Sequence, residues 1–396
     1  MFSLRRGNKR AVYGALIDIG SGTVGVGIVV SNPENPTPTL IYTHRILMRV
    51  TEHKATADID VRKVREALVS ATLILSQEGY QALREYDPNA RITELFVTCA
   101  SPWAYTMVRN VRYENDEPFK ITQAIIDDLV ETAESEIVDH VRKNITLGAS
   151  EFEIIERTTV DITVNDYHVS DPIHVTGSVV SLSHVAGVIP KEIVTSIREI
   201  QDKIFPDTDL HLHTSILGMY CVIRDIFPKM HNYAIIDVTG EATECALVEN
   251  NILIENTHTP QGSNSFVRNI IQKTNRPVAD IQTHLRAYGD KETEVMEFKE
   301  EIESYKKGIA EVVNRIREQR LFPGEIIVTA HRPYTTFFAR TITEAITETL
   351  GKKLSVHTVE TILTDETREG QEEDVYLALI ARFFHKVHRC GEPDEA

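Results

Sequence analysis

The sequence predicts an α/β protein built from two similar halves, with a small α+β unit inserted into the first half. Two segments about 220 residues apart, LIDIGSGTVGVGIVV and IIDVTGEATECALV, share one pattern: an apolar strand ending in Asp, a polar turn and a second apolar strand. Such internal repetition indicates two related domains with a cleft between them. Alternating strands and helices between the two segments indicate the insertion.

Composition limits the classes of protein to which the chain can belong. Its 396 residues suit two or more subdomains. A formal charge of −17 argues against general affinity for nucleic acid, which is bound mainly through Lys and Arg. The 4 cysteines show no CxxC spacing, which favours neither a zinc site nor a disulfide framework. No apolar run approaches the ~20 residues that span a bilayer, and no secretory signal opens the chain. We therefore expect a cytoplasmic protein.

The first half opens with a strand meander. Apolar strands at Ala11–Leu16 and in GVGIVVS are joined by a Gly-rich turn, and LIYTHRILMRV is the third strand. Apolar residues at helical spacing then predict an amphipathic helix over Val61–Glu85. The basic segment MFSLRRGNKR before the first strand is either a solvated terminus or a weak contact with anionic lipid.

The inserted unit is expected over residues 93–179. ITELFVTCASPW predicts a strand that stops at Ser-Pro, and TMVRNVRYE predicts another. Thr122 is a candidate N-cap for the helix in ITQAIIDDLVETAESEIVDHV. Two further stretches, FEIIERTTVDITVNDYHV and HVTGSVVSLSHVAGVI, also read as strands. A helix over Lys191–Ile204 follows the unit.

The second half repeats the meander at 233–237, 243–248 and 252–257, and PQGSNSFVRNIIQ predicts a turn leading into a helix. Residues 275–320 are helical and highly charged, which indicates a small solvated helical subdomain or simply an exposed helix face. EIIVTAHRPYTTFFARTI predicts a strand, turn and helix. The final helix, VYLALIARFFHKVH, is expected to dock on the fold rather than on a membrane surface.

The two turns carry the candidate chemistry. An Asp at the end of a buried strand needs a partner, water or a cation. Asp18 and Asp237, facing each other across a cleft, would hold a hydrated Mg²⁺, which prefers carboxylates, waters and phosphate oxygens. Backbone N–H groups of the turn Gly20-Ser21-Gly22-Thr23 could approach phosphate closely, because two of its four residues lack a Cβ atom.

This pair of hairpins resembles that of the actin, sugar kinase and 70-kDa heat-shock protein superfamily, which grips ATP between twinned domains of ribonuclease H-like fold. The order of elements over nearly the whole chain is similar to one branch, the bacterial division protein FtsA and the pilus assembly protein PilM. That branch inserts a small α+β module, called SHS2, into its first domain, and FVTCASPWAYTMVRNVRYENDEPFKITQAIIDDLVETAESEI looks like the opening of such a module.

The resemblance implies a division of the chain into four parts. The first actin-like domain would comprise residues 1–92, 180–228 and 370–396, and the SHS2-like module residues 93–179. The second actin-like domain would comprise residues 229–272 and 322–369, and the charged helical subdomain residues 273–321.

The resemblance also implies ATP and Mg²⁺ as cofactors. Asp18 and Asp237 would be the catalytic pair and would hold the metal through water. The residues implied to contact the nucleotide lie in four turns: Gly20, Ser21, Gly22 and Thr23; Gly240, Glu241, Ala242 and Thr243; Gly262 and Ser263; and Ala330, His331 and Arg332.

Two departures from the family pattern affect that site. Glu241 stands where the family has a small residue, and its carboxylate would repel a triphosphate unless it points away or contacts Mg²⁺. Ala330-His331-Arg332 replaces a Gly-Gly turn that contacts adenosine, so side chains would crowd the base. Any ATPase activity is therefore expected to be slow at most.

Four functions are compatible with these features. The first is an FtsA-like cytoplasmic scaffold that binds ATP-Mg²⁺, self-assembles and tethers division proteins at the inner face of the membrane. The second is a PilM-like subunit of a type IV pilus or secretion platform, with a groove beside the inserted module receiving a peptide of a membrane protein. The third is a nucleotide-free scaffold whose site has decayed. The fourth, a small-molecule kinase, lacks a convincing general base besides Asp237.

Overall fold

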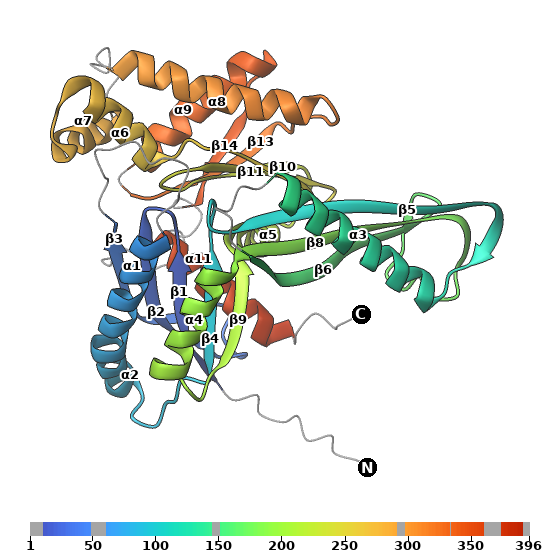
Figure 1. Ribbon diagram of the computed structural model, residues 1–396, viewed down its shortest axis with the longest axis horizontal. Coiled ribbons are helices and arrows are strands. Elements are labelled where there is room, and N and C mark those ends of the chain that lie inside the picture. The colour runs from blue at the N-terminus through green and yellow to red at the C-terminus, as the bar shows by residue number, and fades with distance from the viewer. Residues whose placement is uncertain are drawn as a thin grey trace.

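The computed structural model describes residues 11–48, 61–144, 151–290, 298–332, 334–359 and 374–390. The basic segment 1–10 and residues 291–297 of the charged helical stretch lie outside this part of the chain. Among the residues described, no helix has both the length and the apolar character needed to cross a bilayer. The chain forms two lobes and an arm that projects sideways from between them (Figure 1).

The two lobes contain sheets of identical topology. The first sheet has the order β3-β2-β1-β4-β9, and the second has the order β12-β11-β10-β13-β14. In each, an antiparallel meander of three strands is extended by two parallel strands. The bounds in the first sheet are β1 Val12–Ile19, β2 Thr23–Ser31, β3 Thr39–Leu47, β4 Glu94–Cys99 and β9 Asp209–Thr214. Those in the second are β10 Tyr233–Val238, β11 Thr243–Glu249, β12 Ile252–Thr259, β13 Glu325–Ala330 and β14 Ser355–Thr358.

Helices cover both faces of each sheet. The outer face of the first sheet packs on α1 (Val61–Ile74), α2 (Tyr80–Tyr86) and α4 (Lys191–Ile204), because their apolar residues recur at helical spacing. A π-helical turn, Leu75–Gly79, joins α1 to α2. The outer face of the second sheet packs on α6 (Ser263–Thr274), α7 (Val278–Asp290), α8 (Lys299–Arg317) and α9 (Thr335–Leu350).

One helical layer is shared by the two lobes. Helices α5 (Ser215–Ile226) and α11 (Val375–Cys390) lie in a single apolar cluster that contains Leu16 of the first sheet and Ile235 of the second. The expectation that the final helix docks on the fold is confirmed, because Phe384 of α11 is fully buried against Gly14 of β1. This layer therefore packs against the central strands of both sheets, β1 and β10.

The projecting arm is a four-stranded sheet covered on one face by α3 (Gln123–Asn144). Its strand order is β5-β8-β6-β7. The bounds are β5 Tyr105–Lys120, β6 Phe152–Val164, β7 Tyr167–His168 and β8 Thr176–Pro190. The predicted α+β insertion is therefore present, with its helix between the first and second of its strands.

The limits expected for the insertion differ from those of its sheet. Residues 93–99 were expected to open it, but β4 is hydrogen-bonded between β1 and β9 in the first sheet. Strand β8 was expected to return to the first domain at residue 180, yet it pairs with β5 and β6 up to Val188 and Pro190. These limits depend on tertiary packing, because an apolar strand such as ELFVTC fits the centre of either sheet. The order of elements in the sequence does not decide which sheet it joins.

Candidate functional site

The two repeated hairpins meet at the junction between the lobes. Asp18 and Asp237 end β1 and β10, and the turns that follow them contact each other directly. The Ser21 hydroxyl donates to Thr239 Oγ1 at 3.0 Å and accepts from the backbone N–H of Glu241 at 2.8 Å. Ser21, which was expected to bind phosphate, instead joins the first hairpin to the second.

Glycines allow this close approach. A Cβ atom added to Gly240 would lie 2.7 Å from the backbone nitrogen of Gly22, and one added to Gly22 would lie 3.3 Å from the Gly240 Cα atom. Asn264 of α6 packs against both positions. The backbones of the two turns are therefore in contact, and a phosphate group has no room between Gly22 and Gly240.

Asp18 is paired with an arginine from the edge of the same sheet. Arg45 Nη1 lies 2.8 Å from Asp18 Oδ2, and the same guanidinium binds both oxygens of Asp374, through Nε at 2.5 Å and Nη2 at 2.8 Å. Arg45 lies opposite Gly25 in β2, and Gly25 lies opposite Asp18 in β1. The guanidinium passes over Gly25, where a Cβ atom would stand 2.5 Å from its Nη2 atom.

One guanidinium balances part of the negative charge of the two carboxylates in this cluster. Burial raises the pKa of Asp18, and the Arg45 guanidinium opposes that shift. Burial also acts to raise the pKa of Asp374, but Arg45 and the Leu377 N–H hold it below its ordinary value. Arg45 stays protonated, since both carboxylates outweigh the effect of burial on its pKa. Asp18 thus has a guanidinium as its charged partner, whereas a hydrated cation shared with Asp237 was expected.

Asp237 is buried without a cationic partner among the residues described. Its Oδ1 accepts from the Thr329 hydroxyl at 2.8 Å and from the Tyr376 hydroxyl at 3.0 Å, while Oδ2 has no hydrogen-bond partner. Burial raises the pKa of Asp237 to about 7, against the effect of these two hydrogen bonds. This carboxyl is therefore mostly protonated below neutral pH.

The sheet topology places a threonine beside each aspartate. Thr98 of β4 is in register with Asp18 and donates to it at 3.3 Å, and Thr329 of β13 is in register with Asp237. A cavity of about 10 Å³ lies between Asp18, Thr98, Ser215 and Tyr376. That volume corresponds to about one water molecule.

The turn expected to contact adenosine closes the junction from the opposite side. The His331 ring packs against that of Tyr376 at a tilt of 40°, with ring centroids 4.4 Å apart, and its Nε2 atom lies 3.0 Å from the Thr23 hydroxyl. Burial and the nearby Arg45 lower the pKa of His331 to about 3, so the ring is neutral when it hydrogen-bonds Thr23. Ala330 is buried at the end of β13, and Arg332 is exposed beside it.

The second hairpin is bonded to the start of α6. Backbone N–H groups of Ser263 and Asn264 donate to Thr239 O at 2.8 Å and Gly240 O at 2.7 Å. At Gly262 a Cβ atom would stand 2.5 Å from Thr239 O. The amides at this helix N-terminus, which in other proteins bind anions, are thus engaged by the hairpin itself.

The remaining predicted contacts are also made within the chain. Glu241 points toward α6 and pairs with Arg268 at 2.5 Å, which is the outcome expected if its carboxylate does not face a phosphate. The Thr243 hydroxyl is shared between Gln261 O and the Tyr305 hydroxyl at 2.7 and 2.8 Å. Ala242 is buried beneath the turn.

Sequence reasoning missed three residues of this junction: Arg45, Asp374 and Tyr376. Trp103 also belongs to the junction and is buried there. The Trp103 indole N–H donates to Gly20 O at 2.9 Å and so fixes the first hairpin. Two signals could have indicated Arg45: it is a lone cation inside the apolar run LIYTHRILM, and Gly25 interrupts the neighbouring apolar strand. Asp374 and Tyr376 carry no local signal of this kind.

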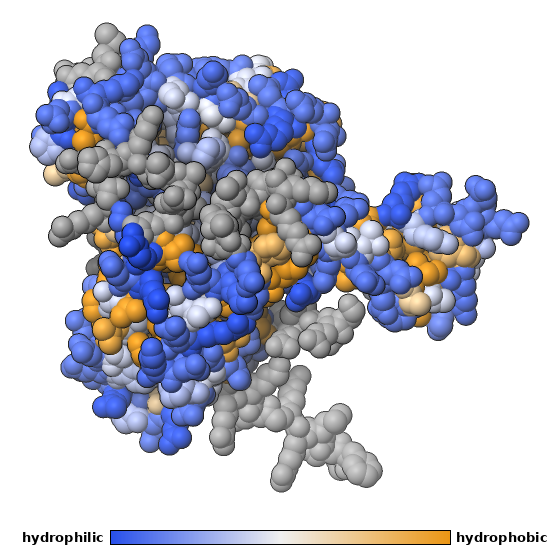
Figure 2. Space-filling view, in the orientation of Figure 1, coloured by the Kyte–Doolittle hydropathy of each residue, from blue (hydrophilic) through white to orange (hydrophobic). Residues whose placement is uncertain are grey.

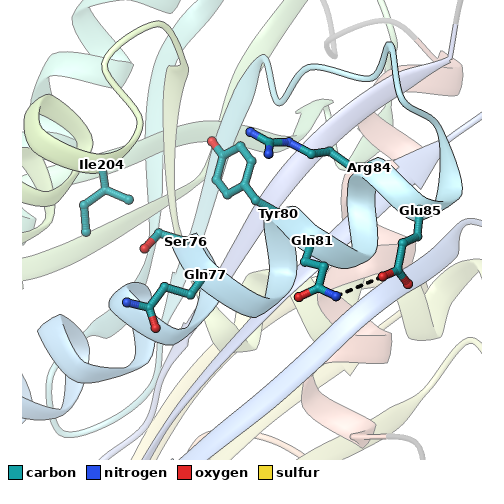
Figure 3. Close-up of a pocket in the computed structure, with 7 residues that line it drawn as sticks. All are labelled: Ser76, Gln77, Tyr80, Gln81, Arg84, Glu85 and Ile204. Atoms are coloured by element: carbon teal, nitrogen blue, oxygen red, sulfur yellow. Dashed lines mark hydrogen bonds between the residues drawn. The ribbon is translucent and has the colours of Figure 1, made fainter.

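The residues described at the junction do not fit ATP-Mg²⁺ in the arrangement observed. The hairpin backbones touch, the α6 amides are occupied, Asp18 is neutralised by Arg45, and Tyr376 with His331 fills the space beside Asp237. A larger cavity of about 610 Å³ lies away from the junction, between α2 and the end of α4 (Figure 3). Its wall contains one cation, Arg84, and Glu85 is bound there to Gln81, so it lacks the converging cations of a phosphate site.

Comparisons with known proteins bear on the fold. No protein-family model matches the sequence, and no curated protein matches it significantly. A chain in the structure of the PilM–PilN type IV pilus biogenesis complex is similar, with a TM-score of 0.58 and 14% identity over 95% of this chain and 99% of that chain. A Bacteroides thetaiotaomicron protein with an actin-like ATPase fold gives a TM-score of 0.45 and 9% identity over 96% and 98% of the two chains. EutJ, an ethanolamine utilization protein of Carboxydothermus hydrogenoformans, gives 0.43 and 11% over 94% and 89%. With its twinned sheets, shared helical layer and paired hairpins, the chain has an actin-like fold.

Proposed function

We propose that this protein is a nucleotide-independent scaffold with a PilM-like role on the cytoplasmic side of a type IV pilus or secretion platform. The observation that carries the proposal is the Arg45 guanidinium, which bridges Asp18 and Asp374 at the position where an ATPase of this fold would need a free carboxylate. A scaffold needs the two lobes held in one arrangement, and the contacts of Ser21 with Thr239 and Glu241 join the two hairpins without a ligand. In this proposal, contacts within the chain fix the arrangement of the lobes, where ATP-Mg²⁺ was expected to do so.

The partner is inferred from the similar structure, in which PilM is part of a complex with PilN. At 14% identity that likeness supports a common fold, and a pilus or secretion partner is part of the proposal. In this proposal the arm comprising β5 to β8 serves as the SHS2-like module, and the partner peptide would bind beside it. The FtsA-like alternative shares the fold and differs in its partners and in its need for ATP.

Isothermal titration with ATP-Mg²⁺ tests the nucleotide part. We expect no heat of binding by the wild-type protein at millimolar ATP, and none by Asp18→Ala. Micromolar binding that Asp18→Ala abolishes would instead support the ATP-binding scaffold and reject nucleotide independence.

Affinity capture from the native organism tests the partner part. The tagged protein should enrich inner-membrane proteins of a pilus or secretion machine over an untagged control. Enrichment of division proteins in their place would assign the protein to the FtsA-like role, whatever the titration shows.

A further inference from the structure

The outer edge of the arm is formed by the long strand β5, whose first residues contact β12 and which pairs with no strand on its outer side among the residues described. Strand β5 is the first strand of its sheet and pairs on one side only, with β8. It runs along the upper edge of the arm in Figure 1, and Figure 2 shows mainly hydrophilic residues there. Residues 112–118 are exposed, and Tyr113 is 45% exposed. An open edge of this length is a template for pairing with another strand.

The charges on this edge are arranged so that β5 of one copy can pair with β5 of a second copy. In the run RNVRYENDE, Tyr113 is flanked by Arg112 on one side and Glu114 on the other. If two copies of β5 pair antiparallel about a two-fold axis at Tyr113, each Arg112 lies opposite the Glu114 of the other copy. Opposite charges directly across an antiparallel pair stabilise it, and like charges destabilise it.

Both charged side chains are exposed at this edge. Arg112 and Glu114 keep 51% and 64% of their side-chain exposure while pairing with each other at 3.4 Å, and Arg112 also lies 3.9 Å from Asp166 in the turn between β6 and β7. A second copy would convert the two intrachain pairs into a cluster of four alternating charges. Tyr113, which packs edge-on against Phe119 at 5.1 Å, would face its own copy, and paired aromatic residues favour such cross-strand sites.

We propose that β5 is a self-association surface, through which two copies of this chain form a symmetric dimer by antiparallel β5–β5 pairing centred on Tyr113. The two-fold operation makes the same patch serve both copies, as in most homodimers. The contact involves one strand from each copy, so the dimer is of the weak, concentration-dependent class. This inference is independent of the proposed function, because it rests on the arm and not on the junction between the lobes.

Sedimentation equilibrium with charge-reversal variants provides the main test. The average mass of the wild-type protein should rise toward twice the monomer mass with concentration. Arg112→Glu and Glu114→Arg should each weaken the dimer at least tenfold, because like charges then face each other. The double variant R112E/E114R restores opposite charges across the axis and should return the dissociation constant to within about threefold of the wild-type value.

Cross-linking at the axis provides a second test that does not depend on charge. Only a residue on a two-fold axis meets itself, so Tyr113→Cys should form a disulfide-linked dimer under mild oxidation. Tyr167→Cys, an exposed position on the opposite edge strand β7, is the matched control and should remain monomeric.

A wild-type protein that stays monomeric at every concentration overturns the proposal. So does a dimer that R112E/E114R fails to restore or that Tyr113→Cys fails to cross-link, and so does β5 pairing with a strand of another protein.

Discussion

Gly25 lies directly opposite Arg45 on the neighbouring strand, and the missing side chain of Gly25 leaves the space through which the Arg45 guanidinium reaches Asp18. Three strands thus contribute one row of residues across the first sheet, with an acid, a glycine and a base in turn. The Arg45 guanidinium also binds Asp374, which lies just ahead of α11. This one side chain therefore links the helical layer to β1, the strand that leads into the first hairpin.

Gly25→Ala should destabilise the protein. The added Cβ atom would stand 2.5 Å from Arg45 Nη2 and displace the guanidinium from a buried carboxylate. We expect urea denaturation to show a loss of about 2–4 kcal/mol in the free energy of unfolding. Gly324→Ala is the matched control, since a Cβ atom there meets nothing within 4 Å, and it should leave stability unchanged. Equal effects of the two substitutions would contradict the role of Gly25.

Arg45→Met should cost more than the double variant D18N/R45M. The single change leaves Asp18 and Asp374 buried with no cation between them, which typically costs about 3–5 kcal/mol. Asp18→Asn removes one of the two unpaired buried carboxylates. The double variant should therefore recover part of the lost free energy of unfolding in the same denaturation assay. If the effects of the two substitutions simply add, Asp18 and Arg45 are not coupled.

Stability should fall as the pH rises through neutrality. The pKa of Asp237 is about 7 in the folded protein and 3.8 ordinarily, so between these values the folded state holds a proton that the unfolded state releases. Burial likewise raises the pKa of Glu244 to about 8. Asp237 alone should lower the free energy of unfolding by about 2 kcal/mol between pH 5.5 and 8.5.

Urea denaturation at those two pH values measures this change. Asp237→Asn has no proton to lose at this position and should show a smaller decrease than the wild-type protein. Asp116→Asn, on the exposed part of β5, should retain the wild-type decrease. A stability that is constant or increases with pH in this range would refute the assignment for Asp237.

Gly240→Ala should separate the two hairpins. Its Cβ atom would lie 2.7 Å from a backbone nitrogen of Gly22, and backbone cannot move aside as a flexible side chain does. We expect the Glu241 amide, now bonded to Ser21, to exchange its hydrogen faster by at least tenfold. Gly20→Ala places its Cβ atom at an ordinary 3.4 Å from its nearest neighbours and should leave that exchange rate near the wild-type value.

The fold was predictable where the pattern is local. The repeated strand, turn and strand around Asp18 and Asp237 needed only a short stretch of sequence each, and the predicted helix Lys191–Ile204 coincides with α4. The twin topology followed from that repetition. The sheet to which β4 belongs could not be predicted in this way, because its apolar residues suit the middle of any sheet and its partners lie far along the chain.

The junction was less predictable than the fold. The hairpins identify where it lies, yet what fills it comes from Arg45, His331 and Tyr376, whose contacts depend on how three distant segments pack. Glu241 illustrates the difference: its charge was noted as a conflict with phosphate, but its pairing with Arg268 depends on the position of α6.

The place of α11 in the shared helical layer has a consequence during synthesis. Strands β1 and β2 leave the ribosome early, while the helix that covers one face of their sheet is encoded more than 340 residues later. At ordinary translation rates this leaves Leu16 and Val29 uncovered for roughly 20–70 s. The sheet of the nascent first lobe thus lacks the helix α11 on one face for most of translation. Molecular chaperones that shield apolar surface would act on it in that interval.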